Sequence, residues 1–212
     1  MKTSALFVFA LLLNSQAWAA TTAKAPIPGA SNSVPAGRKV LSKKEFWDAS
    51  LGMITWQEDI KATRGSDSIQ MQTQSLGMIA TFSKNNWFSK SWRSTYEGDL
   101  AIGALKGKGH ATAISDRLKG QKWFMATFSP GLVARTSPVS EIGFGLPISA
   151  RAITWSLESG SGLSMDKKTS FSVGLSGIYV IRFSPRTALH LAVTHQHMWN
   201  TVMWSAAYDF VF

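Results

Sequence analysis

The sequence predicts an all-β fold, a transmembrane antiparallel up-and-down β-barrel of about eight strands. Segments of about ten to fifteen residues alternate between apolar side chains and small or polar ones, as strands with two different faces do. Mean hydropathy is near zero and the chain holds nine Trp residues, yet no apolar stretch after residue 20 is long enough for a spanning helix. Alternating strands explain this combination, because each gives only half of its residues to lipid. An export signal is the third observation.

That signal occupies residues 1–19. Lys2 precedes a short apolar run over residues 5–13, and Ala17-Trp18-Ala19 forms a small-residue cleavage site. The run is too short for a membrane-anchoring helix. We therefore predict a signal peptide that is removed on export. A lipoprotein anchor is excluded because no cysteine follows the cleavage site.

Two further regions follow the signal peptide. Residues 20–44 are rich in Pro, Ala and Ser and show no periodicity, which predicts a disordered leader. Residues 45–212 contain all the alternating segments and form the predicted barrel. The chain has no cysteine, so this domain must be stabilised without disulfides.

The first three strands are predicted near residues 46–56, 68–82 and 92–104. A charged loop over residues 58–67 and a turn over residues 83–87 separate them. The third strand alternates most clearly: one face carries Trp92, Tyr96, Leu100, Ile102 and Ala104, and the other carries Arg93, Thr95, Glu97, Asp99 and Ala101.

Five more strands are predicted near residues 123–135, 139–155, 171–181, 189–193 and 201–212. Pro130 and Pro147 cannot donate a ladder hydrogen bond, so we expect a bulge or interrupted pairing at both. An even number of strands brings both ends of the barrel to one side. Long connections near residues 59–67, 106–122 and 157–169 should then lie at the opposite end, where residues 198–200 form an exceptionally short turn.

The last strand carries the most specific pattern in the chain. Counting back from the final residue, every second position is apolar: Phe212, Phe210, Tyr208, Ala206, Trp204 and Val202. This ending resembles the last strand of bacterial outer-membrane β-barrel proteins, and the chain is similar to the eight-stranded class that includes the membrane domain of outer membrane protein A. The resemblance implies localisation in the cell outer membrane, a periplasmic leader, and an assembly signal at Tyr208, Phe210 and Phe212 that the barrel-assembly machinery reads.

Counting alternate residues also predicts which charges face the barrel interior. A barrel of eight strands is only wide enough for side chains to fill it, so charges inside must pair or hydrogen-bond. This favours a plug of ion pairs over a path for ions or solutes. The predicted charge network of the lumen comprises Asp48, Arg93, Glu97, Asp99, Glu141, Arg151, Arg182 and Asp209.

Aromatic residues gather at the predicted strand ends, where membrane barrels place belts at the two membrane interfaces. The outer belt would contain Trp56, Trp123, Trp155 and Trp199. Further predicted interfacial aromatics are Trp47, Trp92, Trp204, Tyr208 and Phe210.

The formal net charge of +10 indicates an anionic partner. Export argues against nucleic acid, which leaves outer-membrane lipids and lipopolysaccharide; alternatively the excess charge only keeps the loops solvated. His195 and His197 share one face of a strand, but two ligands are too few for a metal site. We predict no metal and no cofactor, and the sequence leaves the oligomeric state open.

Three functions fit these features. The leading hypothesis is a non-enzymatic role in envelope integrity or surface interaction through external loops. The alternative is a narrow pore for small or hydrophobic solutes. A lipid A-modifying enzyme is third: outer-membrane lipid A deacylases resemble this chain as small barrels with a lipid-facing His and a nearby Ser on a late strand. Here His197 replaces that Ser and Asp209 is expected at the far end of its strand, so no catalytic residue is predicted.

Overall fold

The structure is a computed structural model, and it describes residues 45–108, 121–154, 163–165 and 170–212. The predicted signal peptide and leader lie outside these ranges. No helix that could cross a membrane occurs in the described part of the chain.

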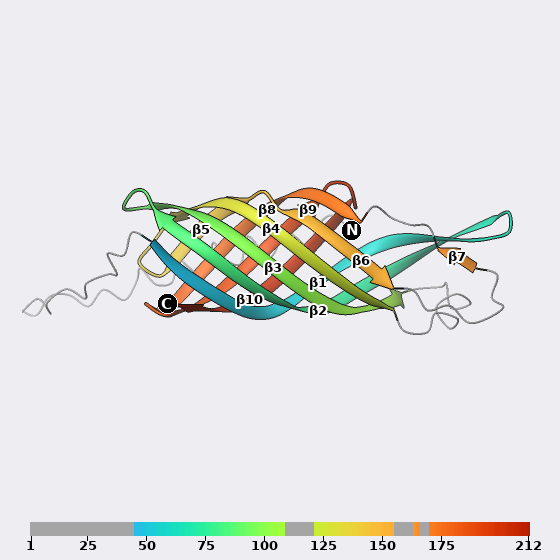
Figure 1. Cartoon of the computed structure of the whole chain (residues 1–212), viewed down its shortest axis with the longest axis horizontal. Helices are drawn as coiled ribbons and strands as arrows, with labels where there is room; N and C mark the ends of the chain where they lie inside the picture. Colours follow the sequence, from blue (N-terminus) through green and yellow to red (C-terminus); the bar gives the residue numbers. More distant parts are fainter. Residues whose placement is uncertain (1–44, 109–120, 155–162, 166–169) are drawn as a thin grey trace, which may run out of the picture. The chain divides into compact units, whose positions relative to one another are not determined.

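The described residues form a closed antiparallel barrel with eight strand positions (Figure 1). The strands are β1 (Glu45–Arg64), β2 (Asp67–Trp87), β3 (Trp92–Lys108), β4 (Lys122–Arg135), β5 (Ser140–Gly145), β6 (Ile148–Thr154), β7 (Leu163–Met165), β8 (Phe171–Ser184), β9 (Thr187–Gln196) and β10 (Thr201–Val211). Because β5 and β6 both pair with β4 and β8, they share one position. Each position pairs with its neighbours in sequence, which confirms the predicted up-and-down barrel.

Pairing between β10 and β1 closes the barrel. The paired residues run from Asp48 with Val211 to Trp56 with Met203, and the amide of Phe212 donates to the carbonyl oxygen of Trp47 at 3.0 Å. Both ends of the barrel segment therefore lie at one rim, here called the terminal end. The opposite rim, where β1 turns into β2, is called the hairpin end.

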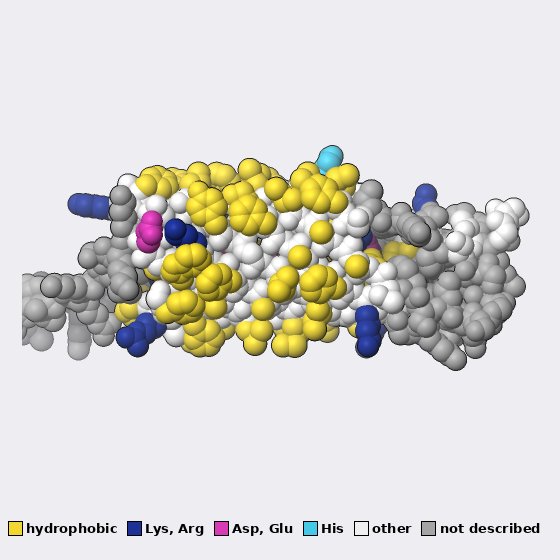
Figure 2. All heavy atoms as spheres, viewed as in Figure 1, with side chains coloured by type: hydrophobic (Ala, Val, Ile, Leu, Met, Phe, Trp, Pro, Cys, Tyr) yellow, Lys and Arg dark blue, Asp and Glu magenta, His cyan; other side chains and the backbone are white. Residues whose placement is uncertain are grey.

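Alternation along the strands follows the predicted phase. In β3, Leu100 and Ile102 are 58% and 59% exposed, whereas Arg93 and Ala101 are only 4% and 1% exposed. Apolar side chains cover the outer surface, as Figure 2 shows for one face. The inner surface carries most of the buried polar and charged groups, so its polarity is the reverse of a soluble protein's.

The predicted charged loop over residues 58–67 is wrong. β1 continues to Arg64 and β2 begins at Asp67, so the connection is the two-residue turn Gly65-Ser66, in which Gly65 has a φ of 60°. Charged residues on both faces of this segment conceal its strand character. The predicted turn at residues 83–87 is also wrong, because β2 runs to Trp87.

The β1–β2 hairpin extends beyond the barrel's closing pairs. β1 pairs with β10 only as far as Trp56, and beyond it β1 remains paired with β2 up to the turn (Figure 1). The short strand β7 pairs with residues 62–64 of β1, although the sequence predicted only a loop there. The predicted connection over residues 106–122 begins too early, because β3 continues to Lys108, and β4 already begins at Lys122. The rest of this connection, and of the one predicted over residues 157–169, lies mostly outside the described residues.

Interrupted pairing is confirmed at Pro147, whereas at Pro130 only one edge of β4 loses its pairs. β4 remains paired with β3 across Pro130, but the fifth strand position breaks at Leu146-Pro147, between β5 and β6. Backbone groups at the break are still hydrogen-bonded to the neighbouring strands. The Leu146 amide donates to the Pro130 carbonyl oxygen at 2.9 Å, and the Gly174 amide donates to the Pro147 carbonyl oxygen at 2.8 Å. Register is the same on both sides of the break, so there is no bulge.

A pair of glycines makes room for an aromatic side chain inside the barrel. Gly77 pairs with Gly103, which in turn pairs with Trp123. A Cβ at Gly103 would meet the Leu76 carbonyl oxygen and lie 2.5 Å from the indole of Trp123. The indole thus lies against bare backbone of two neighbouring strands.

Replacing Gly103 by Ala is expected to lower the free energy of unfolding by about 1–3 kcal/mol, since the added methyl forces backbone or indole to shift. The measurement is the temperature at which the compact folded band on a gel converts to the unfolded one. Gly177→Ala is the matched control, because a Cβ there has no neighbour within 4 Å. Equal midpoints for both variants would contradict this packing account.

Candidate functional site in the barrel interior

The interior near the terminal end is filled by a carboxylate shared among arginines. Glu141 on β5 is fully buried, and its Oε2 accepts from Arg93 Nε at 3.0 Å and lies 2.9 Å from Arg93 Nη2. Arg182 Nε donates to Glu141 Oε1 at 2.7 Å, and Arg182 Nη2 donates to Oε2 at 3.2 Å. Arg135 adds a longer contact of 3.9 Å. Three strands, β3, β5 and β8, are thereby joined across the lumen.

Further groups extend this cluster to the rim. Arg93 also donates to Asn85, whose Nδ2 donates to Asp48 Oδ2 at 2.9 Å. The ring of Phe46 lies 5.6 Å from the guanidinium of Arg93 and 5.7 Å from that of Arg182, within the range of cation–π attraction. An aromatic ring and a network of hydrogen-bonded charges thus fill the lumen at the terminal end.

A second buried ion pair lies toward the hairpin end. Arg151 Nη1 donates to Glu58 Oε1 at 3.1 Å, and Arg151 Nη2 lies 3.0 Å from Oε2 as a close ionic contact. The Arg151 guanidinium also lies 4.2 Å from the ring centroid of Trp199. Both side chains of the ion pair are almost fully buried.

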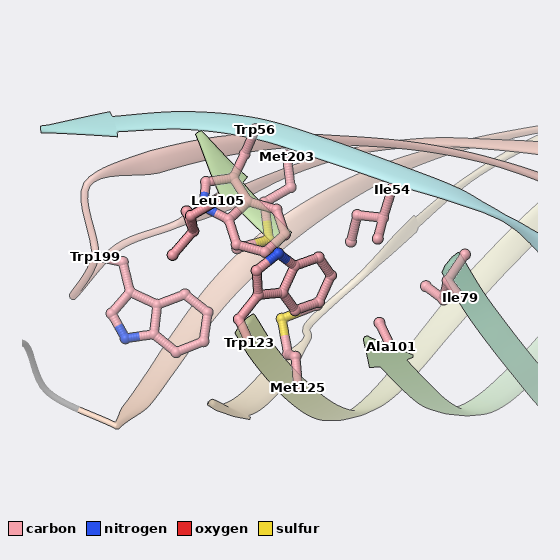
Figure 3. Close-up of a cluster of buried hydrophobic side chains, with 9 residues drawn as sticks. All are labelled: Ile54, Trp56, Ile79, Ala101, Leu105, Trp123, Met125, Trp199 and Met203. Carbon is pink, nitrogen blue, oxygen red and sulfur yellow. The ribbon is translucent and has the colours of Figure 1, made fainter. Parts of the chain in front are cut away.

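An aromatic and aliphatic cluster fills the same part of the lumen, as Figure 3 shows. The rings of Trp56 and Trp123 have centroids 4.4 Å apart, and the Trp123 indole donates to the Ala104 carbonyl oxygen at 3.2 Å. This group, here called the tryptophan cluster, consists of Ile54, Trp56, Ile79, Ala101, Leu105, Trp123, Met125, Trp199 and Met203.

The predicted interfacial positions of Trp56, Trp123 and Trp199 are therefore wrong, because all three residues are buried inside the barrel. Trp56 has the same parity along β1 as Asp48 and Ile54, which face inward. The prediction took the ends of strands as the criterion, although parity decides which side of the wall a residue faces.

The remaining predicted aromatics point outward. Trp47, Trp92, Trp204, Tyr208 and Phe210 are all exposed on the outer surface, and Trp155 lies outside the described residues. The ring of Tyr208 lies 5.1 Å from that of Phe210 and 6.3 Å from that of Phe183 on β8. Phe212 is exposed too, so the three residues of the predicted assembly signal share the outer face; their recognition stays a prediction.

A cavity of about 50 Å³ lies in the lumen and is lined by both apolar and polar side chains. Its walls include Ile54, Ile79 and Met203 of the hydrophobic cluster. The polar lining includes Glu97, Asp99, His190 and Gln196. Such a volume holds only a few water molecules.

All eight charges of the predicted network project from the inner face of the wall. The structure joins Arg93, Glu141 and Arg182 directly but separates Arg151 from them, because Arg151 pairs with Glu58. Asp209 Oδ2 lies 4.0 Å from His190 Nδ1.

Sequence reasoning missed Glu58, Asn85 and His190. Glu58 has the inward parity of Asp48, so continuing the first strand past Trp56 would have found it. Asn85 was missed because the predicted second strand stops at residue 82, whereas β2 continues to Trp87.

His195 and Asp209 are not brought together. Val202, the partner of His195 in the β9–β10 pairing, lies seven positions from Asp209, or about 23 Å along the strand. His195 also has outward parity and Asp209 inward parity. Among the described residues, no group of three or more His, Cys, Asp or Glu side chains could hold a metal ion.

No protein family model matches the chain, and no curated protein matches its sequence. Among solved structures, Ail, the attachment invasion locus protein of Yersinia pestis, is 10% identical over 80% of this chain and 99% of Ail, with a TM-score of 0.49. Neisserial surface protein A is 12% identical over 77% of this chain and 95% of that protein, with a TM-score of 0.45. Both scores are below 0.5, so these proteins lend no support to a function for this chain.

Replacing Glu141 by Gln is expected to lower the free energy of unfolding by about 3–5 kcal/mol, because Arg93 and Arg182 would remain buried without a counter-charge. Urea unfolding in micelles, followed by Trp fluorescence, measures this change. Glu45→Gln is the control: its ion pair with Lys84 spans 3.9 Å at the exposed rim and should contribute about 0–1 kcal/mol. Similar losses in both variants would show that the Glu141 cluster has no special role.

Proposed function

We propose that this protein is an integral outer-membrane β-barrel whose interior is closed to solutes and whose role is non-enzymatic, in envelope integrity or surface interaction. The observation that carries the proposal is the combination of an apolar outer surface with an interior filled at both ends. A barrel of this kind offers its partners only its rims and its outer wall.

Membrane insertion follows from the outer surface. Leu51, Met53, Leu100, Ile102 and Phe144 are all about half exposed, and similar residues surround the barrel. Soluble monomers rarely expose apolar patches larger than a few hundred Å². Export through residues 1–19 and the outward-facing Tyr208, Phe210 and Phe212 support delivery to the cell outer membrane.

The hairpin end is the proposed site of surface interaction. The β1–β2 ribbon extends past the closing strand pairs at this end. Lys106 and Lys122 are exposed at the same rim, next along their strands to the outward apolar residues Ile102, Ala104 and Phe124. Lysines just beyond an apolar band suit the phosphate groups of lipopolysaccharide, which we propose as the neighbouring lipid.

A narrow pore is the second candidate, favoured by the polar cavity in the lumen. Passage would require both the Glu141 cluster and the tryptophan cluster to open. An activity on lipid A is the least supported function, since His195 lacks an acid or a hydroxyl nucleophile in reach on its own face of the β9–β10 pair.

Planar-bilayer recording tests the closed interior. The purified, refolded protein is expected to produce no discrete current steps, because packed side chains fill the lumen at two levels. Trp123→Ala, which removes the indole from the tryptophan cluster, should conduct no more than the parent while the Glu141 cluster remains. Discrete openings whose size changes with Arg93→Ala or Glu97→Gln would instead establish the narrow pore.

A further inference from the structure

Two carboxylates that form no short ion pair with another described residue line the cavity in the lumen. Glu97 and Asp99 both line it, and no ion pair within 4.0 Å involves either residue in the described part of the chain. Glu97 accepts a hydrogen bond from Thr95 Oγ1 at 3.3 Å, and Asp99 accepts one from Thr81. The only cationic candidate in the lining is His190, which lies beside Asp209.

The arginines of the lumen are committed elsewhere. Arg93 and Arg182 bind Glu141, and Arg151 binds Glu58. Arg135 also contacts Glu141, at 3.9 Å, so three arginines share one carboxylate. Their two excess charges and His190 are left to balance the four carboxylates of Asp48, Glu97, Asp99 and Asp209. Uncompensated negative charge in a narrow interior is unfavourable, so a further positive charge would stabilise the fold.

One residue that lines the same space, Gln196, carries an unpartnered side-chain oxygen. Gln196 lines the cavity and is 1% exposed; its Nε2 donates to Ser149 Oγ at 2.7 Å, while its Oε1 has no hydrogen-bond partner. Ser50 Oγ and Asp209 Oδ1, on residues that pair across β1 and β10, are likewise buried without a partner, although neither residue lines the cavity. Buried polar atoms of this kind normally bind water or an ion.

We propose that the cavity binds one small hard cation together with a few water molecules, through carboxylate, amide and hydroxyl oxygens around Glu97, Asp99 and Gln196. Oxygen-only donors favour Na⁺-like or Ca²⁺-like ions over transition metals. The volume of about 50 Å³ admits an ion with part of its water shell and excludes a large organic cation. Na⁺ is the ion that we propose for this site and the probe for its test.

The test compares unfolding temperatures in NaCl and in N-methylglucamine chloride at equal ionic strength, with protein refolded without Na⁺. For the parent protein, Na⁺ at about ten times its dissociation constant should raise the gel-shift midpoint by about 4 °C. The double variant Glu97→Gln, Asp99→Asn should show no difference between the two salts. The control Asp59→Asn, which alters an exposed acid on β1, should keep the full Na⁺ response.

Equal midpoints in the two salts for the parent protein would overturn the proposal, as would a double variant that keeps the response. If the double variant does not fold, Gln196→Met serves instead, because it removes Oε1 at similar side-chain volume and should at least halve the shift. An unchanged shift in Gln196→Met would likewise overturn the site. Stabilisation by Ca²⁺ alone would contradict the choice of Na⁺.

Discussion

The pairing of β10 with β1 is the constraint on which the rest of this structure depends. It joins residues near the two ends of the barrel segment, from Asp48 with Val211 to Trp56 with Met203. Once this seam closes, each of the eight strand positions has a neighbour on both sides, and each side chain within the barrel wall faces either the outside or a narrow interior. The inward polarity of Arg93, Glu141 and Arg182 is then possible only because these residues meet one another.

The two groups of side chains that fill the lumen are held together by different interactions. In the Glu141 cluster, ion pairs join β3, β5 and β8 through one buried carboxylate. In the tryptophan cluster, aromatic side chains pack around Trp56 and Trp123. Buried ion pairs contribute little net stability after desolvation, although removing one partner is costly. Their main consequence here is that side chains occupy much of the lumen, which is the basis of the proposal that larger partners meet only the outer wall and the rims.

Sequence reasoning predicted what depends on local alternation. The phases of β3 and β10 were visible because a strong pattern, such as Trp92 to Ala104, extends over many residues. The β1–β2 hairpin was missed because charges on both of its faces conceal the alternation, and only Gly65 marks the turn. The inward position of Trp123 depends on Gly77 and Gly103, residues on two other strands whose register cannot be known before the barrel closes. The partnership of Glu58 with Arg151 was inaccessible for the same reason.

Single-cysteine scanning along β10 tests the inside–outside assignment most directly, and the natural chain has no cysteine to interfere. Spin labels at residues 202 to 210 would be read in lipid bilayers with oxygen and with a water-soluble nickel complex. Oxygen accessibility is expected to peak at Val202, Trp204, Ala206, Tyr208 and Phe210 and to fall at the residues between them. A profile without this two-residue period, or with the opposite phase, would contradict a barrel that presents this face to lipid.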